Sequence, residues 1–214
     1  MTRWTVVVPV KGTADAKSRL DASEALATAI ALDTVVAAVS VARVIVVTSA
    51  GTGSELEAGS GPGSAPPSGP VFVDAGAEVV VDPGGGLNAA IRAGLEAAGA
   101  DGAELSSGVA VLLGDLPALL PSELLAALTE AQRHPLAFVS DADGEGTVLI
   151  TATGGAAHTP SFGAGSRAAH LAAGYVELDV AAESGLRRDV DTPDDLGALA
   201  ERVGAYTKAA LQRN

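Results

Sequence analysis

The chain contains no cysteine, which excludes a disulfide framework, a thiol nucleophile and a cysteine-based zinc site. Aromatic residues make up only 3% of the sequence, so the core must be built mainly from Val, Leu, Ile and Ala. No uncharged apolar run reaches the roughly 18 residues of a membrane-spanning helix. The N-terminus leads straight into a predicted strand rather than a signal peptide, so we expect a cytoplasmic protein with no membrane partner.

Basic residues are also scarce, with 13 Lys and Arg against 26 Asp and Glu, which gives a net charge of −13. Nucleic acids and anionic membranes bind basic surfaces, so neither is an expected partner. A small phosphorylated ligand stays compatible with this balance, provided that a divalent cation bridges the acidic protein and the anionic ligand.

Several catalytic motifs are absent as well. The sequence has no G-x-x-x-x-G-K-[ST], G-x-S-x-G or H-E-x-x-H motif, which leaves P-loop hydrolysis, serine esterase chemistry and zincin chemistry without a basis. His134, His158 and His170 are too scattered to indicate a metal site, so we expect solvated or structural histidines.

Predicted strands alternate with predicted helices along most of the 214 residues, a length that suits one α/β domain. Apolar runs predict strands at 4–10, 44–48, 78–81, 109–113, 136–140 and 147–151. Helices are predicted at 23–39 and 87–98, from Pro121, and from Pro193, which begins the last helix. This alternation predicts a mostly parallel sheet with helices on both faces.

The segment Gly51–Pro70 interrupts this pattern. It contains six Gly, four Pro and four Ser, and it has almost no side chains to bury. A structureless loop of this length is either a lid or disordered. We interpret it as a disordered insertion within a single domain that spans residues 1–214.

A basic loop follows the first predicted strand. Lys11, Lys17 and Arg19 lie within nine positions, together with Gly12. In open α/β sheets, ligands bind outside the carboxyl ends of the strands. Positive charge concentrated there in an acidic protein indicates a strongly anionic ligand, and a solvated surface loop is the alternative.

A carboxylate stands directly after another buried strand, in Leu112-Leu113-Gly114-Asp115-Leu116-Pro117. Magnesium takes oxygen ligands and usually binds through one or two carboxylates plus substrate phosphates. Asp115 is therefore a candidate metal ligand. The alternative is that Asp115 only caps the turn.

A second acidic cluster covers residues 187–196. Asp189 and Asp191 would lie on one face of an extended strand, which suits a shared metal ion, and the adjacent arginines suit a phosphate. Helix capping explains the rest of the cluster, with Thr192 at the N-cap, Pro193 at N1 and two carboxylates near the helix dipole. Asp141 and Asp143 form a rival acidic pair in a Gly-rich turn.

Two glycine-bearing turns end in a hydroxyl residue, at 144–147 and 162–166. Backbone amides in such turns can form concavities that bind anions. The second turn also matches a dinucleotide fingerprint through Gly163, Gly165 and Ala168, but no strand–turn–helix unit is predicted around it.

With these features in place, the sequence resembles the 2-phospholactate or phosphoenolpyruvate guanylyltransferases of coenzyme F-420 biosynthesis. The matching blocks run in order over residues 6–196: Pro9-Val-Lys11-Gly with Ala16-Lys17-Ser-Arg19-Leu20, Asp82-Pro83 with Leu87-Asn88-Ala-Ala-Ile91, Gly114-Asp115-Leu116-Pro117, Gly146-Thr147, Phe162-Gly163 with Ser166 and His170, and Asp189-Val-Asp191-Thr192-Pro193. The segment 51–70 departs from the family pattern.

The resemblance implies a nucleotidyltransferase-like α/β fold of the nucleotide-diphospho-sugar transferase type, magnesium as cofactor and GTP as donor. GTP would be bound by Lys11, Gly12, Lys17, Arg19 and Asn88, with Lys17 and Asp115 as catalytic residues. Magnesium would be held by Asp115, Asp189 and Asp191. Phosphoenolpyruvate would be bound by Thr147, Gly163 and Ser166.

The reaction implied is attack of an acceptor phosphate oxygen on the α-phosphorus of GTP, with pyrophosphate leaving. That nucleophile is already ionised, so no general base is required, and catalysis consists of positioning and charge neutralisation. The composition and motifs look like the actinobacterial branch, which uses phosphoenolpyruvate. The alternatives are 2-phospho-L-lactate as acceptor, a molybdopterin-type or sugar-phosphate nucleotidyltransferase, and a non-catalytic nucleotide-binding module.

Overall fold

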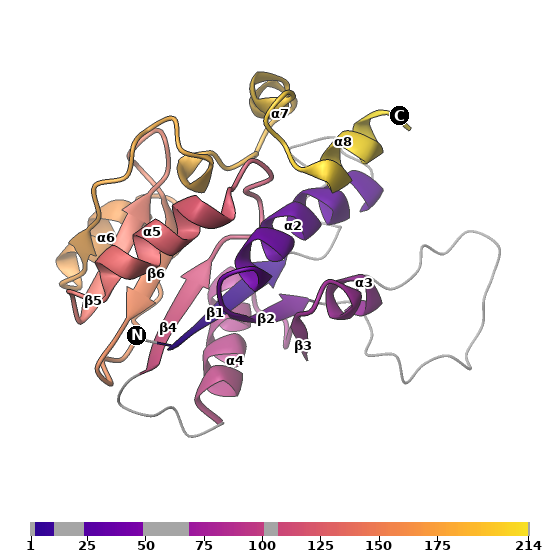
Figure 1. Cartoon of the computed structure of the whole chain (residues 1–214). Helices are drawn as coiled ribbons and strands as arrows, with labels where there is room; N and C mark the ends of the chain where they lie inside the picture. The colour runs from indigo at the N-terminus through magenta and orange to yellow at the C-terminus, as the bar shows by residue number, and fades with distance from the viewer. Residues whose placement is uncertain (1–2, 11–23, 49–68, 101–106, 214) are drawn as a thin grey trace.

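A computed structural model describes residues 3–10, 24–48, 69–100 and 107–213 (Figure 1). The basic loop with Lys11, Gly12, Lys17 and Arg19 lies outside the described residues. So does the glycine- and proline-rich segment, except for Gly69 and Pro70, which begin helix α3.

The centre of the fold is a seven-stranded sheet with the order β3-β2-β1-β4-β6-β5-β7. Its strands are β1 (Arg3–Val10), β2 (Arg43–Thr48), β3 (Glu78–Val81), β4 (Ser107–Leu112), β5 (Leu136–Ser140), β6 (Thr147–Ala152) and β7 (Val176–Glu177). All pairings are parallel except those of β6, which runs antiparallel to both β4 and β5. The predicted mostly parallel sheet is confirmed.

The reversal of β6 decides which residues share an edge. Because β6 runs the other way, its first residue lies beside the carboxyl ends of the neighbouring strands. Thr147 pairs with Ser140 at the end of β5, and Leu149 pairs with Leu112 at the end of β4. Residues that begin β6 therefore meet residues that follow β4 and β5.

Helices cover both faces of the sheet, as predicted. They are α2 (Glu24–Val39), α3 (Gly69–Asp74), α4 (Leu87–Ala100), α5 (Pro121–Ala131), α6 (Ser166–Ala172), α7 (Pro193–Leu199) and α8 (Ala205–Leu211), with a 3₁₀ turn η1 at Gly185–Arg187. Val6 and Val8 of β1 face the cluster that α2, α3 and α5 complete, whereas Val7 faces the cluster with α4. This alternation along the buried residues Val6–Val8 is the period of two that a sheet covered on both sides requires.

The prediction of a single last helix from Pro193 is wrong. The chain forms α7 and then α8, with a break before Ala205. Gly204 donates its N–H to the Pro117 carbonyl, and the Asp33 carboxylate of α2 accepts from the N–H groups of Tyr206 and Thr207. Long-range capping by α2 therefore starts a separate helix.

The short elements α3, α6 and β7 were also not predicted. Each spans seven residues or fewer, too short for a clear hydrophobic period.

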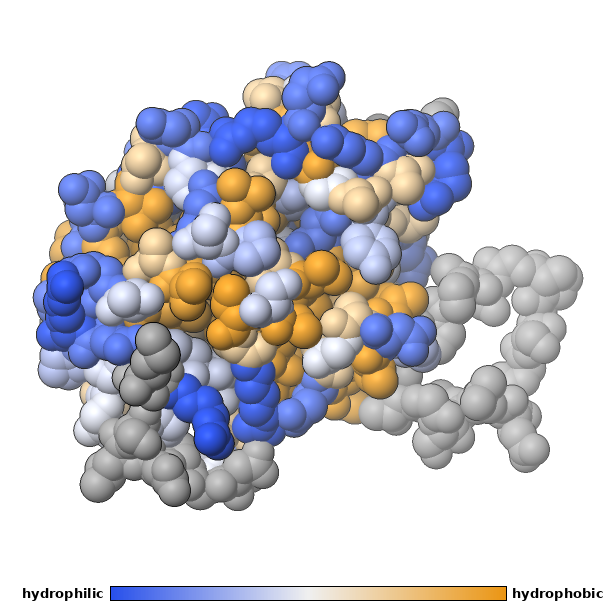
Figure 2. Space-filling view, in the orientation of Figure 1, coloured by the Kyte–Doolittle hydropathy of each residue, from blue (hydrophilic) through white to orange (hydrophobic). Residues whose placement is uncertain are grey.

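Figure 2 shows the face on which α2 and α5 lie, with apolar residues across its middle and hydrophilic residues along its upper and left margins. Among the residues that the structure describes, no helix is long and apolar enough to cross a membrane.

Candidate functional site

Most of the described site residues gather at the carboxyl edge of the sheet. Asp115 follows β4, Asp141 follows β5, and Thr147 begins β6. The segment after η1 joins this edge, because Val190 donates its N–H to the Asp115 carbonyl over 3.0 Å. Chain topology thus brings together residues separated by 75 positions in sequence.

The loop that carries Asp115 is held from two sides. A Cβ on Gly114 would lie 3.2 Å from the Pro9 carbonyl oxygen, so the glycine allows β1 and this loop to approach closely. On the other side, the buried Thr34 hydroxyl of α2 bonds to the Gly114 carbonyl (3.2 Å) and accepts from the Leu116 N–H (3.0 Å). Asp115 is therefore fixed between two braced neighbours.

The segment leading to Asp189 is anchored to α5. The Glu123 carboxylate accepts from the N–H groups of both Gly185 and Leu120, each over 3.0 Å. A Cβ on Gly185 would collide with the Ala118 carbonyl, so η1 packs directly against the chain that follows Asp115. This close packing brings Asp189 near enough to Asp115 for the two carboxylates to interact electrostatically.

The electrostatics of this pair are unfavourable without a counter-charge. Burial, together with the negative charges of Asp115, Asp141 and Asp191, raises the pKa of Asp189 to about 7. After burial, Asp115 makes the largest unfavourable contribution. Like charges that are partly removed from water disfavour ionisation, and a bound cation would reverse that effect.

A pair of carboxylates is the donor set that magnesium commonly uses together with substrate phosphates. Asp115 and Asp189 fit that pattern. Among the described residues, however, no group of three or more His, Cys, Asp or Glu side chains is arranged to hold a metal ion. Asp191 is exposed, and the segment around it forms no strand, contrary to the predicted extended strand. A role for Asp191 as metal ligand stays a prediction.

In the rival acidic pair, Asp141 and Asp143, the Asp141 carboxylate is already bonded to its own turn. The Asp141 carboxylate accepts from the N–H groups of Glu145 (3.0 Å) and Gly146 (2.7 Å) and so closes its own turn. Asp143 is exposed. Both oxygens of Asp141 are already engaged with backbone, which favours Asp115 and Asp189 as the metal-binding pair.

The guanidinium of Arg187 bonds to groups of this chain. It donates to the carbonyls of Ser140, Asp141 and Val180 and to the Ser140 hydroxyl. It therefore ties η1 to the end of β5, and the expectation that it suits a phosphate has no support among these contacts.

The predicted cap of α7 is confirmed. Thr192 is the N-cap and Pro193 occupies the first turn. The Thr192 hydroxyl accepts from the Asp195 N–H (3.2 Å), and the Asp195 carboxylate accepts from the Thr192 N–H (2.8 Å). This reciprocal arrangement is a capping box.

The predicted acceptor residues are linked by His170 of α6. The hydroxyl of Thr147 lies 3.0 Å from Nδ1 of His170, and Nε2 of the same ring accepts from the Ser161 N–H over 3.2 Å. Thr147 and Ser166 are almost fully buried, whereas Gly163 is exposed and has φ of +121°, which favours glycine. The structure brings these three residues to one place, and their binding role stays a prediction.

Asn88 at the start of α4 contacts the same loop. Its carboxamide accepts from the Phe162 N–H (3.1 Å) and donates to the Phe162 carbonyl (3.2 Å). These two bonds join α4 to the residue before Gly163. The predicted contact of Asn88 with GTP is not tested by them.

Two of the three histidines have structural surroundings, as expected. His158 lies within hydrogen-bond distance of the Tyr175 hydroxyl (3.1 Å) and the Val109 carbonyl (3.0 Å). Burial lowers the pKa of His158 to about 4. His170 is fully buried against Phe162 and Tyr175. Sequence reasoning gave neither histidine a partner, because the partners are distant in sequence.

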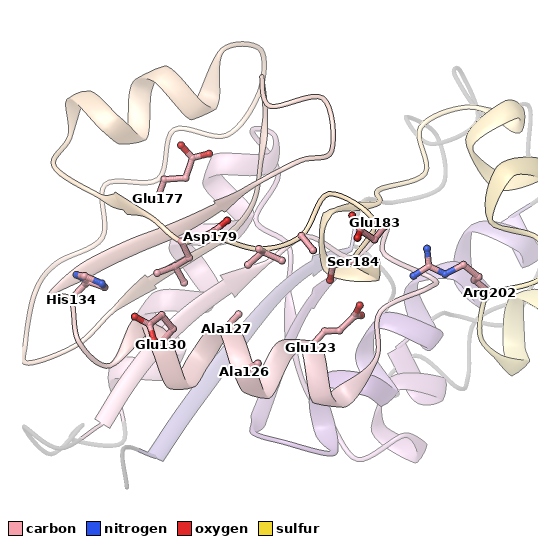
Figure 3. Close-up of a pocket in the computed structure, with 13 residues that line it drawn as sticks. Glu123, Ala126, Ala127, Glu130, His134, Glu177, Asp179, Glu183, Ser184 and Arg202 are labelled. Atoms are coloured by element: carbon pink, nitrogen blue, oxygen red, sulfur yellow. The ribbon is translucent and has the colours of Figure 1, made fainter.

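A cavity of about 750 Å³ lies between α5 and the chain from β7 to η1 (Figure 3). None of the predicted site residues that the structure describes contributes to its lining. Its carboxylates include Glu123, which caps α5, Glu130, which pairs with Arg133, and Glu177, which pairs with Arg167. These three carboxylates are therefore already engaged in a helix cap and two ion pairs.

Comparison with known proteins places the chain among nucleotidyltransferases. The model of the MobA-like NTP transferase domain matches residues 18–187. A phosphoenolpyruvate guanylyltransferase from Streptomyces coelicolor is 47% identical over 228 residues, covering 99% of this chain and 97% of that protein. Another, from Sanguibacter keddieii, is 55% identical over 109 residues, or 49% of this chain and 38% of the relative.

Solved structures agree on the fold. A crystal structure from Desulfovibrio desulfuricans G20, provisionally named a nucleotide-diphospho-sugar transferase, has a TM-score of 0.62 at 17% identity and covers 100% of this chain and 96% of that one. The predicted fold class is thereby confirmed. On the family-model match and the end-to-end similarity together, the chain is a nucleotidyltransferase that belongs to the MobA-like NTP transferase domain family and, within it, to the phosphoenolpyruvate guanylyltransferases.

Proposed function

We propose that this protein transfers GMP from GTP to the phosphate of phosphoenolpyruvate, giving enolpyruvyl-diphospho-guanosine and pyrophosphate, as a step of coenzyme F-420 biosynthesis. The observation that carries the proposal is the pair Asp115 and Asp189 at the carboxyl edge, where neighbouring negative charge and burial disfavour ionisation of Asp189. A bound cation would offset this repulsion, and a triphosphate bound with that cation is the substrate of a nucleotidyltransferase.

The reaction requires positioning more than proton transfer. An ionised phosphate oxygen of the acceptor attacks the α-phosphorus in line, the bond to the β-phosphate oxygen breaks, and pyrophosphate leaves. We assign Lys11, Gly12, Lys17, Arg19 and Asn88 to GTP. The cationic side chains would stabilise the charge on the phosphates, and Lys17 would act directly at the reacting group.

Asp115 and Asp189, with Asp191 as a third candidate, would hold magnesium. When bound, the ion supplies charge neutralisation at the phosphate oxygens. The braces on Asp115 from Thr34 and the anchoring of η1 by Glu123 support this assignment, because metal ligands need fixed positions.

The acceptor would lie against Thr147, Gly163 and Ser166. Two hydroxyl groups and a glycine whose backbone is exposed suit a ligand with a phosphate and a carboxylate. The same donors would bind 2-phospho-L-lactate, which differs at one carbon. A difference of that size in a pocket is worth only about 1–3 kcal/mol. The names of the relatives favour phosphoenolpyruvate.

The test is steady-state kinetics of pyrophosphate release with GTP, Mg²⁺ and either acid. We expect a higher kcat/KM with phosphoenolpyruvate, and mass spectrometry should detect its guanylylated product. A higher kcat/KM with 2-phospho-L-lactate would transfer the proposal to that acceptor. Absence of turnover with both acids would reject it.

A further inference from the structure

The ring of His170 lies between the predicted acceptor residues and has no exposed surface. It packs edge-on against Phe162 and Tyr175, with ring centroids 5.3 Å and 5.2 Å apart, and at a tilt to Phe138 at 6.1 Å. A ring enclosed on these sides has little freedom to turn. Both of its nitrogens nevertheless have polar neighbours, so its orientation and tautomer are determined by hydrogen bonds.

One of these neighbours cannot change its role. The Ser161 N–H is a backbone donor, and it points at Nε2 over 3.2 Å. Nε2 must therefore be the acceptor and carry no proton. Burial lowers the pKa of His170, and hydrogen bonding with the Ser166 backbone opposes that effect only in part. A neutral ring with a bare Nε2 has its proton on Nδ1.

The tautomer fixes the direction of the next hydrogen bond. A protonated Nδ1 can only donate, so in its 3.0 Å contact with Thr147 the hydroxyl oxygen can act only as an acceptor, alongside the Ser166 backbone to which the ring also bonds. The hydroxyl proton of Thr147 is then unavailable to the ring and is directed elsewhere. His170 thus converts a group that can donate or accept into one that donates.

We propose that His170 is a positioning residue for the acceptor: its Nδ1–H tautomer makes the Thr147 hydroxyl a donor to an anionic oxygen of the phosphorylated acid, while Nε2 holds the Ser161–Gly163 loop. This proposal rests on the proposed function for the identity of the ligand. It adds a residue that does not itself touch substrate. The backbone bond from Arg167 N–H to the Glu145 carbonyl (3.2 Å) supports it, because it fixes α6 beside the start of β6.

The two ring nitrogens can be tested separately. His170→Asn places an amide nitrogen near Nδ1 and keeps a donor to Thr147, whereas His170→Gln places an amide oxygen near Nε2 and keeps an acceptor for Ser161. Thr147→Val removes the hydroxyl at similar volume. We expect His170→Gln and Thr147→Val each to raise KM for phosphoenolpyruvate about tenfold, with KM for GTP within about twofold of wild type. His170→Asn, which keeps the donor to Thr147, should have a KM for phosphoenolpyruvate closer to that of wild type than His170→Gln has.

Coupling between the two sites gives a further readout. If His170 acts through the Thr147 hydroxyl, the double variant Thr147→Val with His170→Gln should be no worse than Thr147→Val alone. Multiplying effects in the double variant, or an unchanged acceptor KM in His170→Gln, would overturn the proposal. If the His170 variants do not fold, Thr147→Ser provides the test, because serine keeps the hydroxyl. Its KM for phosphoenolpyruvate should be close to that of wild type. A KM raised as much as in Thr147→Val would also overturn the proposal.

The tautomer itself is measurable without activity. ¹⁵N–¹H correlation spectra of the histidine rings in the substrate-free protein should show His170 as the Nδ1–H form, and an Nε2–H form would refute the inference. This result does not depend on the acceptor. If the wild type does not turn over phosphoenolpyruvate, the proposed function fails, whereas the tautomer measurement still decides the geometry of His170.

Discussion

Two polar regions lie at the same edge of the sheet, and their polar groups have different partners: the region around His170 is buried, and the region around Asp189 is partly buried. Around His170, each described hydrogen bond joins a donor to an acceptor between neutral groups. Around Asp189, burial and the negative charges of neighbouring carboxylates raise the pKa of Asp189 to about 7. Buried polar groups are tolerated when paired, whereas like charges are costly without a counter-ion.

The difference indicates which region is satisfied by its own hydrogen bonds and which one a bound cation would stabilise. The neutral network stabilises the fold by itself and can hold donors in a fixed direction. The negative charge of Asp115 and burial disfavour ionisation of Asp189, and a bound cation would offset this effect. Substitutions should therefore separate the two regions: changes in the acidic pair should affect turnover most, and changes in neutral contacts should affect stability or acceptor binding.

The largest effect is expected from Asp115→Asn. The amide keeps the shape of the side chain but removes the charge that would balance magnesium, which should lower turnover by about 10³-fold or more. The Thr34 hydroxyl holds this loop through the Gly114 carbonyl and the Leu116 N–H. These bonds do not involve the Asp115 side chain, so the fold should persist. Pyrophosphate release measures turnover, and thermal unfolding checks the fold.

Asp143→Asn is the matched control, because Asp143 belongs to the rival acidic pair and is exposed. It should retain turnover within about twofold of wild type. Near-normal turnover in a folded Asp115→Asn protein, or a large loss in Asp143→Asn, would move the metal site to the other pair.

Asp189→Asn should have opposite effects on activity and stability. Turnover should fall, while the metal-free protein should become more stable at pH 8 by about 1–3 kcal/mol, because the substitution removes a disfavoured charge. The folded pKa of about 7 lies above the ordinary value of 3.8, so wild type loses stability as pH rises between these values. The advantage of the variant should therefore shrink from pH 8 to pH 5.

Urea unfolding in the presence of a chelator measures this difference. Added Mg²⁺ with GTP should stabilise wild type and leave Asp189→Asn almost unchanged. A variant that is less stable than wild type at pH 8 without metal would show that Asp189 is not held among repelling charges.

The neutral region should respond to acid in the opposite sense. The pKa of His158 is about 4 in the folded protein, below the ordinary 6.5, because of burial. The unfolded chain binds the proton more tightly, so stability is full above pH 6.5 and declines as pH falls toward 4. Between pH 7 and pH 5 this residue alone should cost about 2 kcal/mol of unfolding free energy.

His158→Gln tests the assignment. The variant should be less stable at pH 7 but show a shallower loss toward pH 5, and His134→Gln, on a residue only half-buried, should follow wild type. An equal slope in wild type and His158→Gln would assign the acid sensitivity to other groups.

Sequence patterns predicted the parts of this molecule that depend on neighbours along the chain. The capping box at Thr192 was predictable because its partner is three residues away. The position of Asp115 after a strand was also predictable from the sequence, since a buried strand and its end are local features. The sheet edge therefore could be located before its geometry was known.

Contacts between distant segments could not be predicted. The Thr147–His170 bond depends on the reversal of β6, and the contacts of Arg187 with Ser140 depend on how η1 packs. Neither arrangement leaves a periodic signal. From the sequence alone, an arginine close to two aspartates suggests a phosphate ligand. The carbonyl partners of Arg187 are visible only in the structure.

The smallest expected effect separates the two roles inside residues 189–195. Thr192→Ala removes the hydroxyl that accepts from the Asp195 N–H, and loss of such a cap typically costs about 1 kcal/mol of stability. The Val190 N–H bond to the Asp115 carbonyl does not involve this side chain, so Asp189 should keep its place. We expect turnover within about twofold of wild type at 25 °C, with a lower unfolding midpoint. Thr192→Ser, which can restore the cap, is the control for stability. A large loss of turnover in Thr192→Ala, without a matching loss of folded protein, would mean that the start of α7 belongs to the reacting site and that capping does not account for Thr192.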